Sequence, residues 1–286
     1  MLGVVSAIEQ AKVRAGAAAT RAGVQIVELD SARAQADARW IFDQVWPTVD
    51  GSTQVRPNLL RAIVHAGGYC VAAFDTDTHA LLGATLAILG QTHDPRGLGA
   101  PPSTAQYRPV TFLHSHMAGV VATARNRHIG TAMKLHQRWW ALARDIPVVT
   151  WTFDPLVRRN ARLNLCNLGV LVARYHVNFY GEMHDAINAG DPTDRVVAWW
   201  DLDSERAEAA AAGALGPISH DAAVAAAGTI ELVDTPEDIV TLRTADSAAA
   251  QYWRLRMRGQ LVEAFDRGRI IDAITDQGSY VLRSHS

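Results

Sequence analysis

The sequence lacks the features that mark several large classes of protein. It has two cysteines, Cys70 and Cys166, which fit no zinc-site spacing and form no disulfide framework. No apolar run approaches the roughly 20 residues of a membrane-spanning helix. A signal peptide has basic residues before its apolar stretch, and the short apolar stretch at the N-terminus has none. The formal net charge of −2 gives no sign of affinity for nucleic acid or anionic lipid. We therefore expect a cytoplasmic protein with free thiols and with neither a nucleic-acid nor a membrane partner.

The chain does have enough apolar residues for a large core. It has 286 residues, of which 49% are hydrophobic, which is more than one compact domain usually needs. Shifts in composition predict four segments. These are an N-terminal helical extension at 1–24, a main domain at 25–203, an alanine-rich linker at 204–228 that could also form loosely packed helices, and a small α+β unit at 229–286.

Apolar periodicity and turn residues predict a mixed α/β domain. Strands at 69–74 and 80–89 flank the polar residues 75–78, which is typical of a hairpin. A loop at 91–109, rich in proline and glycine, follows, and a loop of this length is often functional, so we expect it to shape a substrate site. Strands and helices then alternate, at 110–121, 129–144, 147–152, 158–168, 170–177 and 195–202. The C-terminal unit is predicted to contain a strand at 229–233, a helix cap at 234–237, a long helix and a hairpin at 270–274 and 279–282.

The most informative segment runs from His114 to Lys134. An apolar strand leads into a turn with Arg125 and Arg127, and a helix starts near Gly130. The first N–H groups of a helix have no partners within it, and together with the helix dipole they attract anions. The two arginines can add charge-assisted hydrogen bonds. The pattern predicts a pyrophosphate pocket; the alternative is an ordinary strand–turn–helix with surface arginines.

This segment resembles motif A of the GNAT N-acetyltransferase superfamily, Arg/Gln-x-x-Gly-x-Gly/Ala. Arg125-x-x-His128-x-Gly130 keeps the usual distance from the strand, with histidine in a glycine position. Arg127-x-x-Gly130-x-Ala132 matches the letters but lengthens the turn, so we favour the first register. Segments 151–156, 159–169, 179–182 and 194–195 also resemble a bacterial subfamily of predicted acetyltransferases, some of which accompany N-acylamino acid racemases.

The resemblance implies a mixed, mostly antiparallel GNAT-type sheet flanked by helices, with a small α+β C-terminal extension. It implies an acyltransferase that moves an acetyl or succinyl group from acyl-CoA to a small-molecule primary amine, with amino acids among the candidates. The amine would attack the thioester directly. Asn160 would bind the pantetheine arm or cap its helix. The implied CoA-binding residues are Met117, Gly119, Val120, Val121, Arg125, Asn126, Arg127, His128, Ile129, Gly130, Thr131, Ala132 and Asn160.

The resemblance leaves the catalytic groups open. His114 and His116 lie on one face of the predicted strand, where either could accept a proton or be a structural histidine. No third ligand is evident beside them, so we predict no metal. Glu182 and His184 are alternative bases.

The expected proton donor is missing from its usual place. In many GNAT enzymes a tyrosine follows the helix alanine by four residues, and counting from Ala161 this position is Leu165. Water, Tyr175, Tyr180 or Asn160 would then protonate the thiolate. Asp154, which precedes a proline, either binds an acceptor ammonium or orders its loop, and we favour the loop.

Two other functional classes stay open. One is a non-catalytic regulatory protein that binds acyl-CoA through a GNAT fold. The other is an assembly protein whose C-terminal unit makes a homodimer.

Overall fold

The computed structural model describes residues 6–48, 50–104, 109–181, 192–226 and 228–284. The chain divides into two compact units. The first unit contains Met1–Gln91 and Val110–Val149, and the second contains Thr92–Pro109, Thr150–Met183 and Gly190–Ser286. No helix in the described ranges is long and apolar enough to cross a bilayer.

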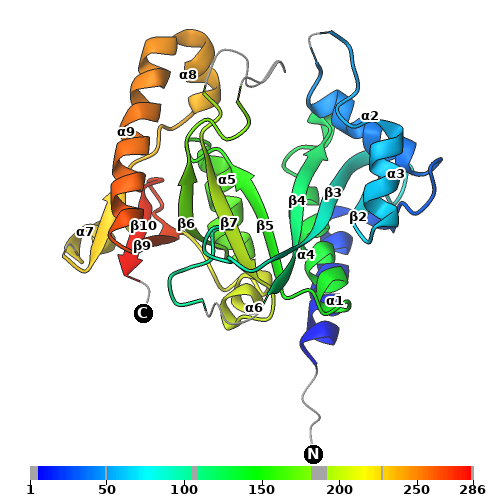
Figure 1. The fold of residues 1–286 in the computed structure, drawn as a ribbon, viewed down its shortest axis with the longest axis horizontal. Helices are drawn as coiled ribbons and strands as arrows, with labels where there is room; N and C mark the ends of the chain where they lie inside the picture. Colours follow the sequence, from blue (N-terminus) through cyan, green and yellow to red (C-terminus); the bar gives the residue numbers. More distant parts are fainter. Residues whose placement is uncertain (1–5, 49, 105–108, 182–191, 227, 285–286) are drawn as a thin grey trace, which may run out of the picture. The chain divides into compact units, whose positions relative to one another are not determined.

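The first unit is a sheet with helices on both faces (Figure 1). Its strands follow the order β1-β2-β3-β4, and the β1–β2 and β2–β3 pairs are antiparallel. Its elements are α1 (Ala7–Ala22), β1 (Val24–Glu28), α2 (Gln35–Val45), α3 (Pro57–His65), β2 (Tyr69–Asp75), β3 (Leu81–Thr92), β4 (Val110–Val120), a 3₁₀ turn (Ala122–Ala124) and α4 (Ile129–Leu142).

Side-chain alternation along β2 separates the two helical layers of this unit. The Tyr69 hydroxyl hydrogen-bonds with Nδ1 of His136 on α4, at 2.9 Å. Cys70 and Ala72, with the opposite parity to Tyr69, belong instead to the core beneath α2 and α3. One face of the sheet therefore carries α4 and the other carries α2 and α3.

Helix α1 is a capped part of this unit. Ser6 accepts a hydrogen bond from the backbone N–H of Glu9, and Gly23 ends the helix in the left-handed conformation. One face is made of small buried residues, and α1 packs extensively on α4. The buried residues are Ala11, Ala15, Ala18 and Ala22.

The second unit is also built on a sheet, with strand order β5-β7-β6-β9-β10-β8. Val172 of β6 pairs with Ile271 of β9, so strands from the C-terminal segment extend the sheet that holds β6 and β7. Its elements are β5 (Val148–Phe153, which starts in the first unit), α5 (Arg158–Arg162), a π-helix (Leu163–Leu168), β6 (Leu171–His176), β7 (Arg195–Asp201), α6 (Glu205–Ala211), α7 (His220–Ala225), β8 (Ile230–Val233), α8 (Ile239–Ala245), α9 (Ser247–Asp266), β9 (Arg269–Ile274) and β10 (Tyr280–Ser284).

The predicted fold class is confirmed: the protein is mixed α/β with helices flanking the strands, and its C-terminal extension is α+β. The helix expected at 158–168 is present and changes from α to π geometry at Leu163. The alanine-rich segment contains two short helices, capped by Ser204 and Ser219, in agreement with the alternative of loosely packed helices. One local prediction was wrong. The helix cap expected at 234–237 is Asp238, whose carboxylate accepts from the N–H groups of Val240 and Thr241.

Candidate functional site

The turn between β4 and α4 exposes backbone to solvent. Asn126 and His128 both adopt the left-handed conformation, with φ of 66° and 60°. Residues 125–128 are exposed. The first backbone bond within α4 runs from the N–H of Ala132 to the carbonyl of His128, at 3.1 Å. The N–H groups of residues 129–131 therefore have no partner within the helix, which creates the anion-attracting geometry predicted for this turn.

His128 occupies the glycine position of the favoured motif register. Its left-handed φ is one that glycine adopts without strain. The structure thus explains why glycine would be favoured here and shows that the histidine reaches the same conformation.

The two arginines of this turn differ in their partners. The Arg127 guanidinium bonds to the Asp75 carboxylate at 2.8 Å and to the carbonyl of Ala22 at 3.3 Å. Hydrogen bonds from Thr78 and then from Arg127 lower the pKa of Asp75. Arg125 is exposed, and among the described residues its guanidinium has no hydrogen-bond or ion-pair partner. Arg127 therefore stabilises the turn through its contacts within the protein, whereas Arg125 is the arginine that is open to a ligand.

The first turn of α4 divides between core and surface. Ile129 and Ala132 are buried, whereas Gly130 and Thr131 are half-buried. No heavy atom lies within 4 Å of the position that a Gly130 side chain would take. A ligand can therefore reach the backbone at Gly130 and Thr131, while Ile129 and Ala132 fix the helix to the core.

Strand β4 changes face between Ser115 and Met117. The Ser115 hydroxyl accepts a hydrogen bond from Lys134 on α4, at 2.8 Å. Met117 packs instead in the core of α2 and α3, together with Val121. Residues two apart in a regular strand lie on the same face, so the alternation is broken here, as in a β-bulge. A bulge at this point would leave backbone groups near His116 outside the ladder.

Helix α2 covers the strand just after this irregularity. A side chain built on Gly119 would lie 3.0 Å from Val45 and 3.1 Å from Trp46, at the C-terminal end of α2. Gly119 therefore permits the close approach of the Trp46 indole to β4. The contact of Val45 and Trp46 with β4 could not be predicted from the sequence, because about 70 residues separate them from the strand and no local pattern links them.

The two histidines of β4 lie on one face, as predicted. Their ring centroids are 6.1 Å apart; His114 is half-buried and His116 is exposed. Burial, followed by the charges of His116 and Lys134, lowers the pKa of His114 to about 4. Partial desolvation by neighbouring protein atoms also lowers the pKa of His116, although this residue is exposed to solvent. Both imidazoles are therefore neutral at pH 7 and able to accept a proton.

The other predicted residues lie in the second unit or outside the described chain. Glu182 and His184 fall outside the described residues. The Tyr180 hydroxyl is 2.9 Å from that of Thr152. Asn160 is half-buried, and the residue at the N-cap of α5 is Val157, so the capping role predicted for Asn160 was wrong. Leu165 is buried.

Tyr175 is a poor candidate for the proton donor. Its hydroxyl donates to the Asp194 carboxylate at 2.6 Å. Burial and this hydrogen bond raise the pKa of Tyr175 well above its usual value. The proton is therefore held between two partners within the protein.

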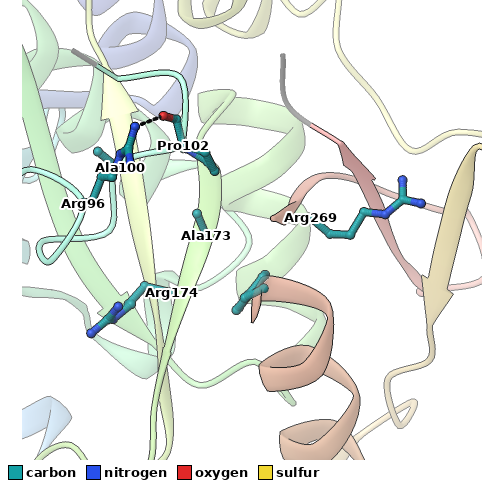
Figure 2. Close-up of a pocket in the computed structure, with 7 residues that line it drawn as sticks. Arg96, Ala100, Pro102, Ala173, Arg174 and Arg269 are labelled. Atoms are coloured by element: carbon teal, nitrogen blue, oxygen red, sulfur yellow. Dashed lines mark hydrogen bonds between the residues drawn. The ribbon is translucent and has the colours of Figure 1, made fainter. Parts of the chain in front are cut away.

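Part of the predicted substrate loop lines a pocket of about 210 Å³ in the second unit (Figure 2). Its walls include Arg96, Ala100 and Pro102 from the loop, and Arg174 and Arg269. The Arg96 guanidinium turns back to the Pro102 carbonyl, and Figure 2 shows Arg174 and Arg269 pointing away from each other. The arginines therefore do not converge on one point. Across the described ranges, His, Cys, Asp and Glu assemble no group of three or more that could hold a metal.

Comparison with known proteins gives distant structural likeness only. No protein-family model and no curated protein matches the sequence. Arabidopsis thaliana NAA60 in complex with acetyl-CoA has 17% identity and a TM-score of 0.46, over 62% of this chain and 99% of that chain. An N-acetyltransferase from Staphylococcus aureus Mu50 has 16% identity and a TM-score of 0.44, over 63% and 98%. FeeM, an N-acyl amino acid synthase from uncultured soil microbes, has 12% identity and a TM-score of 0.41, over 63% and 91%.

The structures found in this way include GNAT N-acetyltransferases. Their likeness to this chain is too distant to transfer a residue, a substrate or a mechanism.

Proposed function

We propose that this protein is an acyl-CoA-dependent N-acyltransferase of the GNAT type. It would move an acetyl or succinyl group to a primary amine, with amino acids as the first acceptors to test. One observation carries the proposal: β4 places two neutral histidines and a break in its alternation just ahead of an open helix N-terminus. Such an arrangement suits a thioester on the strand and a pyrophosphate at the helix.

The cofactor would bind along the strand and turn. Backbone groups from Met117 to Val121 would pair with the pantetheine arm. The pyrophosphate would accept hydrogen bonds from the N–H groups of residues 129–131, with Arg125 adding a charge-assisted bond. Arg127 would support the turn through its ion pair with Asp75.

The chemistry requires a neutral amine and a polarised carbonyl. His116 or His114 would accept a proton from the acceptor ammonium. The free amine then attacks the thioester carbon, forming the C–N bond, and the C–S bond breaks as the tetrahedral oxyanion collapses. Backbone N–H groups at the irregularity near His116 would stabilise that oxyanion. The CoA thiolate leaves and takes a proton from water, and the acylated nitrogen gives up its extra proton to water as the amide forms.

Ligand binding is the first test. Saturating acetyl-CoA, succinyl-CoA or free CoA should raise the melting temperature, because a ligand that binds only the folded state stabilises it. Dephospho-CoA and pantetheine serve as shortened probes, and the loss of the pyrophosphate should abolish most of the shift. If no CoA species stabilises the protein, the proposal fails.

Turnover is the second test. Release of free thiol from acetyl-CoA and succinyl-CoA should depend on an added amine, in a panel of amino acids and simple amines. The regulatory alternative is favoured by the buried Leu165 at the usual donor position. It predicts a thermal shift without thiol release for any amine.

A further inference from the structure

The chain contains two lysines, Lys12 and Lys134, and all its other Lys or Arg residues are arginines. Lys12 is exposed on α1, whereas Lys134 on α4 is only 7% exposed. An arginine stays protonated throughout the physiological pH range, but a buried lysine can lose its proton. The chain therefore has one buried cation of the titratable kind, and it lies behind the strand of the candidate site.

The contacts of Lys134 connect it to that strand. Its ammonium donates to the Ser115 hydroxyl at 2.8 Å and to the Gln137 side-chain carbonyl at 3.4 Å. Ser115 stands between His114 and His116, whose rings project from the other face of β4. The ammonium thus lies behind the strand from His114, on which its charge acts, and next to the point where the alternation breaks.

Titratable groups also lie on the elements packed against α4. Helix α1 presents alanines to α4. Tyr69 of β2 is bonded to His136, and Glu28 of β1 is bonded to Trp140. The titratable or charged groups near this helix include His114, Tyr69, Glu28 and Arg144 and, on α4 itself, His136 and Arg138.

The electrostatics follow from this placement. Burial lowers the pKa of Lys134 to about 7. The Lys134 charge is one of the causes that depress the pKa of His114, after burial and the charge of His116. A cation behind the strand makes a positive charge on the His114 imidazole unfavourable.

We propose that Lys134 is a positioning residue for the two histidines of β4. Its ammonium holds Ser115 at the break in the strand, and its charge extends the pH range over which His114 stays neutral and able to accept a proton. This inference deepens the proposed acyl transfer and rests on it for its role in turnover. The effect on the histidines themselves can be measured without any cofactor.

The decisive experiment is a histidine titration by NMR on the full chain, with signals assigned by His114→Gln and His116→Gln. In Lys134→Met the titration midpoint of His114 should rise by about one pH unit, since a nearby cation is lost. Lys134→Arg keeps the charge and should leave this midpoint low. Lys12→Met is the matched control and should change nothing. An unchanged His114 midpoint in a folded Lys134→Met protein would overturn the proposal.

A measurement on the unmodified protein covers the case in which Lys134→Met does not fold. With ¹³Cε-labelled lysine, the two lysines give two signals, assigned with Lys12→Met. The Lys134 signal should titrate near neutral pH; a midpoint above about 9, near that of an ordinary lysine, would refute the inference.

Activity then separates this inference from the proposed function. In Lys134→Met the acid limb of kcat/KM should move to higher pH by about the same one unit, because the base is protonated earlier. Lys134→Arg should retain the wild-type limb. If the histidine midpoints move but the wild-type protein shows no turnover, the proposed function fails and the electrostatic coupling stands.

Discussion

The chain turns from a strand into a helix between β4 and α4 and again between β5 and α5, and both turns contain arginines. In the first turn, Arg125 is exposed and has no partner among the described residues. In the second, the Arg158 guanidinium donates to the Thr235 hydroxyl at 3.0 Å and to the Thr235 carbonyl at 2.6 Å. Arg162 donates to the carbonyl of Asp276 at 2.6 Å. The second turn is thus filled by the C-terminal segment.

The difference extends to the charges buried near each turn. Asp154 lies at the start of the β5–α5 turn. Its carboxylate accepts hydrogen bonds from the guanidinium groups of Arg243 and Arg254 and from the backbone N–H of Leu156. Burial acts to raise the pKa of Asp154, but Arg254 and Arg243 outweigh it and the pKa is lowered. The loop role that we favoured for Asp154 agrees with these contacts. An arginine in a strand–helix turn therefore indicates a ligand site only where no distant segment of the same chain binds it.

The largest expected effect comes from breaking the filled turn. Asp154→Ala should lower the free energy of unfolding by about 3–5 kcal/mol, because it leaves the buried Arg254 without its carboxylate. Urea denaturation followed by circular dichroism measures the loss. Glu263→Ala removes an exposed partner of Arg267 and should cost less than about 1 kcal/mol. Equal effects of the two changes would show that the buried pair has no special importance.

At the open turn, the largest effect should come from the proposed base. His116→Ala should lower kcat by about 100-fold or more, since general bases contribute on that scale. Its dissociation constant for CoA should stay close to that of the wild type. His65→Ala, on the exposed end of α3, is the control. Full activity of His116→Ala across a broad pH range would eliminate His116 as the base.

A smaller effect is expected from closing the backbone at the turn. Gly130→Leu should weaken CoA binding by more than about 10-fold, because the new side chain occupies the approach to the helix N-terminus. The melting temperature should not fall, because the space around Gly130 is open. Gly259→Leu on α9 has equally open surroundings and should leave CoA binding unchanged. Calorimetric binding at wild-type strength by Gly130→Leu would contradict a phosphate site here.

The smallest effects should separate the two arginines of the open turn. Arg125→Ala should weaken CoA binding by about 10-fold, the worth of one charge-assisted hydrogen bond, without a change in stability. Arg127→Ala should lower the free energy of unfolding by up to about 1 kcal/mol and affect CoA less. Titration calorimetry and urea denaturation on both variants give the result. The reverse pattern would support the motif register that begins at Arg127.

The sequence predicted those parts of the molecule whose causes are local. The hairpin of β2 and β3 follows from its turn, where the Asp75 carboxylate accepts from the N–H groups of Asp77 and Thr78. Strand β4 and helix α4 follow from their apolar periods. The common face of His114 and His116 follows from strand alternation.

The parts that could not be predicted depend on distant segments. Nothing near Arg127 indicates that its partner is Asp75, 52 residues earlier. The change of face after Ser115 accompanies packing on α2 and the bond from Lys134, and residues 115–117 include no glycine that would indicate a bulge there. Pairing of β6 with β9 joins segments about 100 residues apart, so the sequence pattern treated the C-terminal strands as a separate unit. The four-part domain division stays a prediction.

Arg127 connects the N-terminal helix α1 to the turn after β4, a role that the alanine-rich composition of this helix does not indicate. Its guanidinium reaches the carbonyl of Ala22, the last residue of α1, as well as the carboxylate of Asp75. A chain shortened by its first 22 residues would lose none of the groups assigned to chemistry. The truncation would nonetheless remove the Ala22 carbonyl, one of the three groups that Arg127 binds beside the Gly23 carbonyl and the Asp75 carboxylate. We therefore expect weaker CoA binding rather than a changed reaction.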